Sequence, residues 1–166
     1  MTIDLLKRTA SFVVLCLVQA LVLNRIHLFD CATPLLYVYM VLTFPHDYPK
    51  WAVMLWGFVL GVAVDSFSNT PGMTSASLTL VGAVQPYFFN LFVQRDAPDD
   101  IAPSVASMGV AKFTFYATVL VLLHCLVFFT LEMFSFFNWM QWLKCVAGST
   151  LITMVLVLTI EKVRRQ

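Results

Sequence analysis

The stretch over residues 51–67, WAVMLWGFVLGVAVDSF, decides the fold class of this chain. A helix that crosses a membrane needs roughly 17–25 residues that are mostly apolar. This stretch has that length, and its single ionisable side chain, Asp65, comes close to its end. We therefore expect a transmembrane helix over these residues.

Five more apolar stretches lie on either side of this one. They cover about residues 9–23, 34–44, 73–93, 109–131 and 138–160. Of the 166 residues, 60% are hydrophobic and only 11% are charged, whereas a soluble domain carries about 25% charged residues. The sequence therefore predicts an all-α integral membrane protein, in which residues 1–166 form a single transmembrane domain with six transmembrane helices. The second stretch is short for a spanning helix, although Pro34 suits a first helical turn.

The Lys and Arg residues predict the orientation of the chain, because cytoplasmic loops of membrane proteins carry an excess of them. With the N-terminus inside, eight of the ten fall on the cytoplasmic side, and only Arg25 and Lys144 fall on the outer side. Six crossings return the C-terminus to the side of the N-terminus. We therefore expect a multi-pass protein with both termini in the cytoplasm.

Small and polar side chains share one face of the stretch over residues 51–67 and its exit. Gly57, Gly61, Asp65 and Ser68 are spaced by four, four and three residues, which places them on the same side of a helix. Two glycines at this spacing let another helix approach closely. A carboxylate near the edge of the hydrocarbon layer is costly unless it faces protein or water. The pattern predicts a face for helix packing or partner contact, with an ordinary interfacial Asp65 as the alternative.

Side chains that carry chemistry are sparse in the apolar stretches. Gln85 precedes Pro86, which can kink a helix, and His124 has no acidic or cysteine neighbour in sequence. The chain has no phosphate-binding loop, no zinc-protease motif, no nucleophile elbow and no metal-ligand spacing. A net charge of +1 gives no field that would attract nucleic acid. We therefore expect no catalytic residues, no cofactor, no metal and no nucleic-acid partner.

An acidic cluster separates the fourth and fifth apolar stretches. It consists of Asp96, Asp99 and Asp100. A solvated cytoplasmic loop is the simpler interpretation of this cluster. A docking surface for a basic cytoplasmic partner is the alternative.

Three segments together resemble a known family. They are NRIHLF at residues 24–29, ATPLLY at residues 32–37, and GVAVDSFSNTPG at residues 61–72. In these segments, and in its length and helix number, the chain resembles the bacterial rod shape-determining protein MreD family. The resemblance makes Gly61, Asp65 and Ser68 the motif positions.

The resemblance implies a function as well as a fold. It implies a fold similar to that of the substrate-binding subunits of energy-coupling-factor transporters, and a place in the bacterial inner (cytoplasmic) membrane. It also implies a non-catalytic subunit of the cell-elongation machinery, which links an MreC-like scaffold protein, an MreB-like cytoskeletal protein and the cell-wall (peptidoglycan) synthesis enzymes to regulate cell shape.

A small-solute (vitamin-like) binding subunit of a membrane transporter is the alternative function. That class keeps alanines four residues apart on its first helix to meet its coupling partner. Here Ala10 is followed four residues later by Val14, and Ala20 by Asn24. The pattern is missing, so the sequence favours the cell-shape function.

Overall fold

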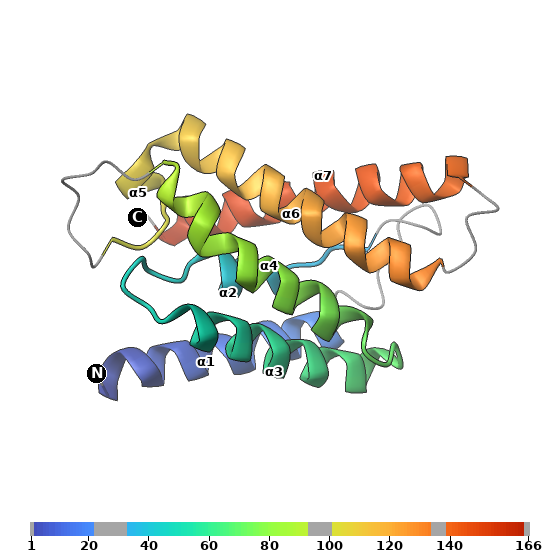
Figure 1. The fold of residues 1–166 in the computed structure, drawn as a ribbon, viewed down its shortest axis with the longest axis horizontal. Coiled ribbons are helices and arrows are strands. Elements are labelled where there is room, and N and C mark those ends of the chain that lie inside the picture. Colours follow the sequence, from blue (N-terminus) through green and yellow to red (C-terminus); the bar gives the residue numbers. More distant parts are fainter. Residues whose placement is uncertain (1, 22–32, 93–100, 134–138, 165–166) are drawn as a thin grey trace.

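Helices are the only regular secondary structure in the part of the chain that the structure describes. A computed structural model describes residues 2–21, 33–92, 101–133 and 139–164. Its helices are α1 (Thr2–Leu21), α2 (Val38–Leu42), α3 (Lys50–Ser68), α4 (Met73–Asn90), α5 (Val105–Met108), α6 (Val110–Glu132) and α7 (Trp139–Arg164). Their arrangement is shown in Figure 1. The expectation of an all-helical chain is confirmed for these residues.

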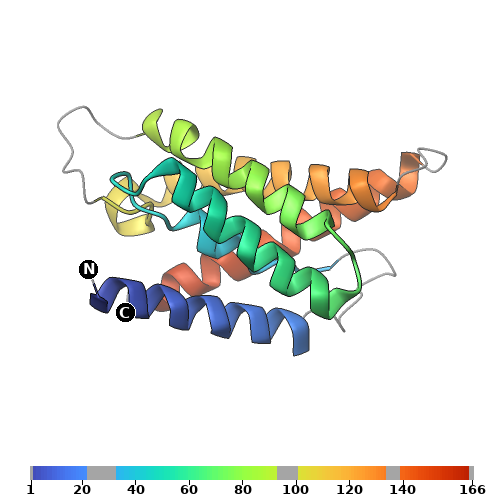
Figure 2. The same ribbon diagram turned by 60° about the horizontal axis from the view of Figure 1, so that its bottom comes forward.

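The long helices form a single bundle in which α1, α3 and α6 run in one direction and α4 and α7 run in the other. Figures 1 and 2 both show that α1, α3 and α6 begin at one end of the bundle, where α4 and α7 finish. This end is called the N-terminal end below, and the opposite end is called the far end. The antiparallel pairing of α3 and α4 follows from the short turn between them, because helices joined by a tight turn lie antiparallel.

Three of the described helices are long and apolar enough to cross a membrane. They are α3, α6 and α7. The apolar part of α1 is shorter and covers Arg8–Gln19. Helix α4 has 18 residues but includes several Thr, Ser and Gln side chains, which lower its hydropathy. The structure thus shows three membrane-capable helices, fewer than the six that the sequence predicts.

Most of the expected helix positions agree with the structure to within a few residues. The stretches expected at 51–67, 73–93, 109–131 and 138–160 correspond to α3, α4, α6 and α7. Helix α1 begins earlier than the expected 9–23, because its first turns include polar residues that a hydropathy pattern does not reveal.

The second expected helix, over residues 34–44, is wrong in form. Only α2 is helical there, and its five residues span about 7.5 Å at 1.5 Å per residue. The chain before it is not helical, because its backbone N–H groups bond to side chains of α7 instead of to carbonyls one turn earlier. A hydropathy pattern detects burial of this segment but not its backbone conformation.

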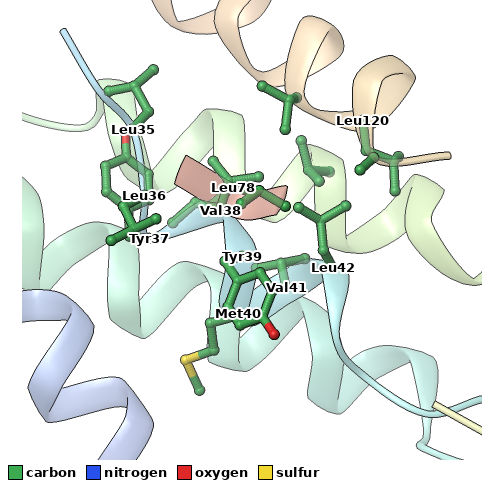
Figure 3. Packing of buried hydrophobic residues seen from close by; sticks show 14 of the residues in the cluster. Leu35, Leu36, Tyr37, Val38, Tyr39, Met40, Val41, Leu42, Leu78 and Leu120 are labelled. Carbon is green, nitrogen blue, oxygen red and sulfur yellow. The ribbon is translucent and has the colours of Figure 1, made fainter. Parts of the chain in front are cut away.

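Residues 33–44, called the buried segment below, form the centre of the core. Ten of these twelve residues are buried, all except Thr33 and Thr43, which are partly buried. Figure 3 shows side chains from Leu35 to Leu42 beside Leu78 of α4 and Leu120 of α6. The bundle is therefore packed around a short, largely irregular piece of chain.

Candidate functional site: the α3–α4 contact and the polar cradle of the buried segment

Asp65 closes the turn between α3 and α4. Its Oδ1 atom accepts hydrogen bonds from the backbone N–H of Thr74 at 3.0 Å and from the Thr70 hydroxyl at 3.1 Å, and its Oδ2 atom accepts one from the N–H of Ser75 at 3.0 Å. Two of these donors belong to the first turn of α4, whose N–H groups have no partner inside the helix and carry a partial positive charge. Asp65 is 6% exposed, and these bonds offset the cost of burying its charge.

The glycines of α3 allow its close contact with α4. A Cβ atom added to Gly61 would overlap the backbone of Ser75, lying 2.6 Å from its nitrogen. At Gly57 an added Cβ would lie 3.0 Å from the carbonyl oxygen of Leu78. Gly82 of α4 approaches Val53 of α3 in the same way, at 3.2 Å from the carbonyl oxygen. The glycine face therefore serves packing inside this chain.

The structure thus brings Gly57, Gly61 and Asp65 together against α4. Ser68 is the last residue of α3 and is partly buried. The acidic cluster of Asp96, Asp99 and Asp100, and residues 24–29 of the family resemblance, lie outside the described residues.

The first part of the buried segment is held by two hydroxyls of α7. The backbone N–H of Thr33 donates to Ser149 Oγ at 3.1 Å, and that of Leu35 donates to Thr153 Oγ1 at 3.0 Å. Ser149 and Thr153 stand four residues apart, or about 6 Å along a helix. Thr33 and Leu35 cover that length in two residues, so the chain is extended here.

Gln19 of α1 bonds to the buried segment from the other side. Its Nε2 atom donates to the carbonyl of Pro34 at 2.9 Å, and its Oε1 atom accepts from the N–H of Leu36 at 3.1 Å. One amide side chain thereby replaces both hydrogen bonds that a regular helix would supply. A buried amide in an otherwise apolar helix is stable because both its donor and its acceptor are used.

The end of the buried segment is held in a similar way by α4 and α6. Gln85 Nε2 donates to the carbonyl of Phe44 at 3.2 Å and to the Tyr116 hydroxyl at 3.0 Å. The Tyr116 hydroxyl in turn donates to the carbonyl of Leu42 at 3.1 Å. Irregular backbone is tolerated at membrane depth only where protein satisfies its polar groups, and these side chains meet that condition.

Two tyrosines extend the network outward from the buried segment. The Tyr37 hydroxyl lies 3.1 Å from His124 Nε2 and also contacts the Thr74 side chain at the start of α4. His124 is fully buried. The tyrosine thus connects the buried segment to the turn that Asp65 closes.

Tyr39 reaches a buried carboxylate near the end of α7. Its hydroxyl donates to Glu161 Oε2 at 2.8 Å, and Glu161 Oε1 accepts from the backbone N–H of Val105 at 3.0 Å. An N–H of Arg164 lies 3.5 Å from the same tyrosine hydroxyl. Glu161 therefore links α7, the buried segment and the first turn of α5.

Sequence reasoning identified some of this network and missed the rest. Gln85 and His124 stand out as polar residues in apolar stretches. Ser149, Thr153 and Glu161 were not predicted, although their spacing of four and eight residues places them on one face of α7. That polar stripe is the signal that reveals a face turned toward a polar backbone.

The arrangement defines a helical membrane protein in which buried polar side chains hold the backbone in place. Among the described residues there is no group of three or more His, Cys, Asp and Glu side chains that could hold a metal ion. The carboxylates of Asp65 and Glu161 each accept backbone N–H groups at a helix start. Comparisons with protein-family models, curated proteins and solved structures find no match for this chain.

Proposed function

We propose that this chain is a non-catalytic membrane subunit of the MreD type, which joins partners of the bacterial cell-elongation machinery. In this proposal it crosses the inner membrane six times, has both termini in the cytoplasm, and binds an MreC-like scaffold. Through that contact it associates with an MreB-like cytoskeletal protein and the enzymes of wall synthesis. Its role depends on the shape of its helix surfaces.

One observation carries the proposal. Four polar side chains inside the bundle bond to the buried segment or to a helix start and so maintain the architecture: Gln19, Asp65, Gln85 and Thr153. Support also comes from the position of the segments that resemble the MreD family. Tyr37, in one segment, contacts Thr74, whose backbone N–H bonds to Asp65 in the other segment. The two described family segments therefore meet in one packed unit.

The buried segment supports six crossings in spite of the short α2. An extended residue advances about 3.3 Å along the chain, against 1.5 Å for a helical residue. The segment runs from beside Ser149 to beside Glu161 of α7 and on to Gln85 near the end of α4. A partly extended chain buried in protein therefore crosses most of the bundle with fewer residues than a helix needs.

The charges of the described residues support the proposed orientation. Helix starts and ends at the N-terminal end of the bundle carry Arg8, Lys50, Lys112, Lys162 and Arg164, whereas Lys144 stands in the first turns of α7 at the far end. The excess of positive charge marks the cytoplasmic side.

The outer face of α3 is the surface that this proposal assigns to a partner helix. Gly57, Gly61 and Asp65 already contact α4, so they are not available to another protein. The opposite side of α3 presents large apolar side chains that are about half exposed: Leu55, Phe58, Val59 and Val62. A partner helix or lipid can cover such a ridge.

Cysteine crosslinking in a rod-shaped bacterium that depends on this chain tests the proposal. We expect Phe58→Cys and Val62→Cys on α3 to crosslink to the MreC-like protein. The matched controls Leu151→Cys and Val155→Cys, on the exposed face of α7, should not crosslink. We also expect Phe58→Ala with Val62→Ala to round the cells while the chain stays inserted. Equal crosslinking from both helices, or normal rods with the double variant, would count against the proposal.

A small-solute binding subunit is the second candidate, and one observation favours it. Transporters place solutes where irregular backbone interrupts helices at the membrane midplane, and the buried segment is such an irregular piece. Its backbone groups, however, bond to Gln19, Gln85, Ser149 and Thr153, which leaves fewer of them to bind a solute. Tight, stoichiometric binding of a vitamin by the purified chain would make this function the better proposal.

A further inference from the structure

We propose that Arg8 forms a binding site for the phosphate group of an anionic phospholipid at the N-terminal end of the bundle. The proposal requires that the chain is inserted in a membrane. It does not depend on any protein partner, so it can hold even if the cell-shape function does not.

Two aromatic rings fix the position of the Arg8 guanidinium. Its carbon Cζ lies 4.8 Å from the ring centroid of Phe44 and 4.7 Å from that of Tyr48. Phe44 is fully buried, and the Tyr48 hydroxyl accepts a hydrogen bond from Trp56 Nε1 at 3.2 Å. Because the fold holds both rings, the arginine is positioned before any ligand binds.

The hydrogen-bonding capacity of Arg8 is unused within the described part of the chain. A guanidinium has five N–H donors, which point outward in its plane, whereas aromatic rings contact its flat face. Among the described residues, Arg8 contacts the two rings and makes no hydrogen bond or ion pair. A phosphate fits this need, because its oxygens accept two parallel N–H donors from one arginine.

The depth of Arg8 favours a lipid as the source of that phosphate. The apolar part of α1 begins at Arg8, which places the residue where the hydrocarbon layer meets the headgroups. Lys50, over the ring of Tyr87 at 4.3 Å, and the exposed Trp51 stand at the start of α3 at the same end of the bundle. Basic and aromatic side chains of this kind anchor helices at headgroup level.

Lipid retention by the purified full-length chain tests the proposal. The chain is exchanged into detergent micelles that contain equal amounts of phosphatidylglycerol and phosphatidylcholine, and native mass spectrometry then counts the lipids that remain bound. We expect preferential retention of phosphatidylglycerol, which Arg8→Gln lowers about fivefold. Arg8→Lys should also lower it, because a lysine keeps the charge but loses the planar fork. Circular dichroism confirms that both variants remain folded.

Lys162→Gln is the matched control, because it removes an exposed positive charge at the same end of the bundle. We expect it to change retention less than about twofold, since a lysine offers a phosphate no planar fork of N–H donors. Equal losses with Lys162→Gln and Arg8→Gln would indicate diffuse attraction and overturn the proposal. Unchanged retention in both Arg8 variants would overturn it too. Complete displacement of the lipid by millimolar inorganic phosphate would show that the site takes free phosphate instead.

Discussion

At the scale of single residues, Asp65 shows how a carboxylate can be stable in an apolar bundle. Its two oxygen atoms accept three hydrogen bonds, two of them from the first turn of α4. The residue belongs to α3 but acts as the N-terminal cap of the next helix. It thereby fixes both the turn and the contact between the two helices.

Replacing Asp65 with alanine should destabilise the folded chain by about 1–3 kcal/mol, because two backbone N–H groups at the start of α4 lose their buried partner. The measurement is thermal unfolding in detergent. Unfolding is detected by the reaction of a maleimide dye with the Cys125 thiol, which is buried in the folded chain. Ser66→Ala is the matched control, since Ser66 is exposed and its hydroxyl donates to the Val62 carbonyl of its own helix. Equal melting temperatures for the two variants would contradict this role of Asp65.

Residue spacing predicted which residues share this face of α3, but not which helix packs against it. The positions of Gly57, Gly61 and Asp65 on one side of a helix follow from counting alone. That the face meets α4 within the same chain depends on the turn at Asn69, which adopts a left-handed conformation with φ of 57°. A spacing pattern contains no information on which of several helices will occupy a glycine face.

At the scale of elements, the buried segment is the feature that departs most from a simple helix bundle. It replaces one long helix with extended residues followed by the five-residue α2. Side chains from α1, α4, α6 and α7 supply the hydrogen bonds that the missing helical turns would have made. Each of these helices therefore depends on the segment for part of its packing, and the segment depends on them.

Replacing Thr153 with valine should destabilise this element while leaving its shape intact. Valine has nearly the same volume but leaves the N–H of Leu35 without a partner, at a cost of about 1–3 kcal/mol. We expect faster hydrogen exchange at the Leu35 amide and a lower melting temperature in detergent. Thr159→Val is the control, because Thr159 is exposed on the same helix and its hydroxyl donates to the Val155 carbonyl within that helix. Equal exchange at the Leu35 amide in both variants would contradict the proposed role of the Thr153 hydroxyl.

The sequence could predict that residues 34–44 are buried, but not that they are irregular. Hydropathy measures only the cost of contact with water, and Leu, Val and Tyr have that property in any backbone conformation. The deciding information stands more than a hundred residues later, in the stripe of Ser149 and Thr153 on α7. Local patterns cannot combine two segments that meet only in the folded chain.

At the scale of the whole molecule, the two ends of the bundle differ in their described positive charges. Most described Lys and Arg residues stand at the N-terminal end, where α1 begins and α7 ends (Figures 1 and 2). The middle of the bundle is filled with apolar side chains and hydrogen-bonded polar groups. In the proposed function, this division sets the orientation of the protein in the membrane, with the positively charged end on the cytoplasmic side.

Reporter fusions test that orientation directly. Green fluorescent protein attached after residue 166 should fluoresce, because both termini are expected in the cytoplasm, and alkaline phosphatase at the same place should be inactive. Alkaline phosphatase inserted between α6 and α7 should be active, because one further crossing separates that point from the C-terminus. An active phosphatase at the C-terminus would place that end outside the cytoplasm and refute the proposed topology with both termini in the cytoplasm.

The distance along the chain between the buried segment and α7 has a consequence for biosynthesis. Thr33 and Leu35 are separated from the hydroxyls that they bond to by 116 and 118 residues. A ribosome adds about 5–20 residues per second, so these peptide groups are made roughly 6–24 seconds before their partners. Unpaired extended backbone is not stable in lipid. The peptide groups of Thr33 and Leu35 can therefore gain these partners only after α7 has been made, whereas the partners on α1, α4 and α6 are made earlier.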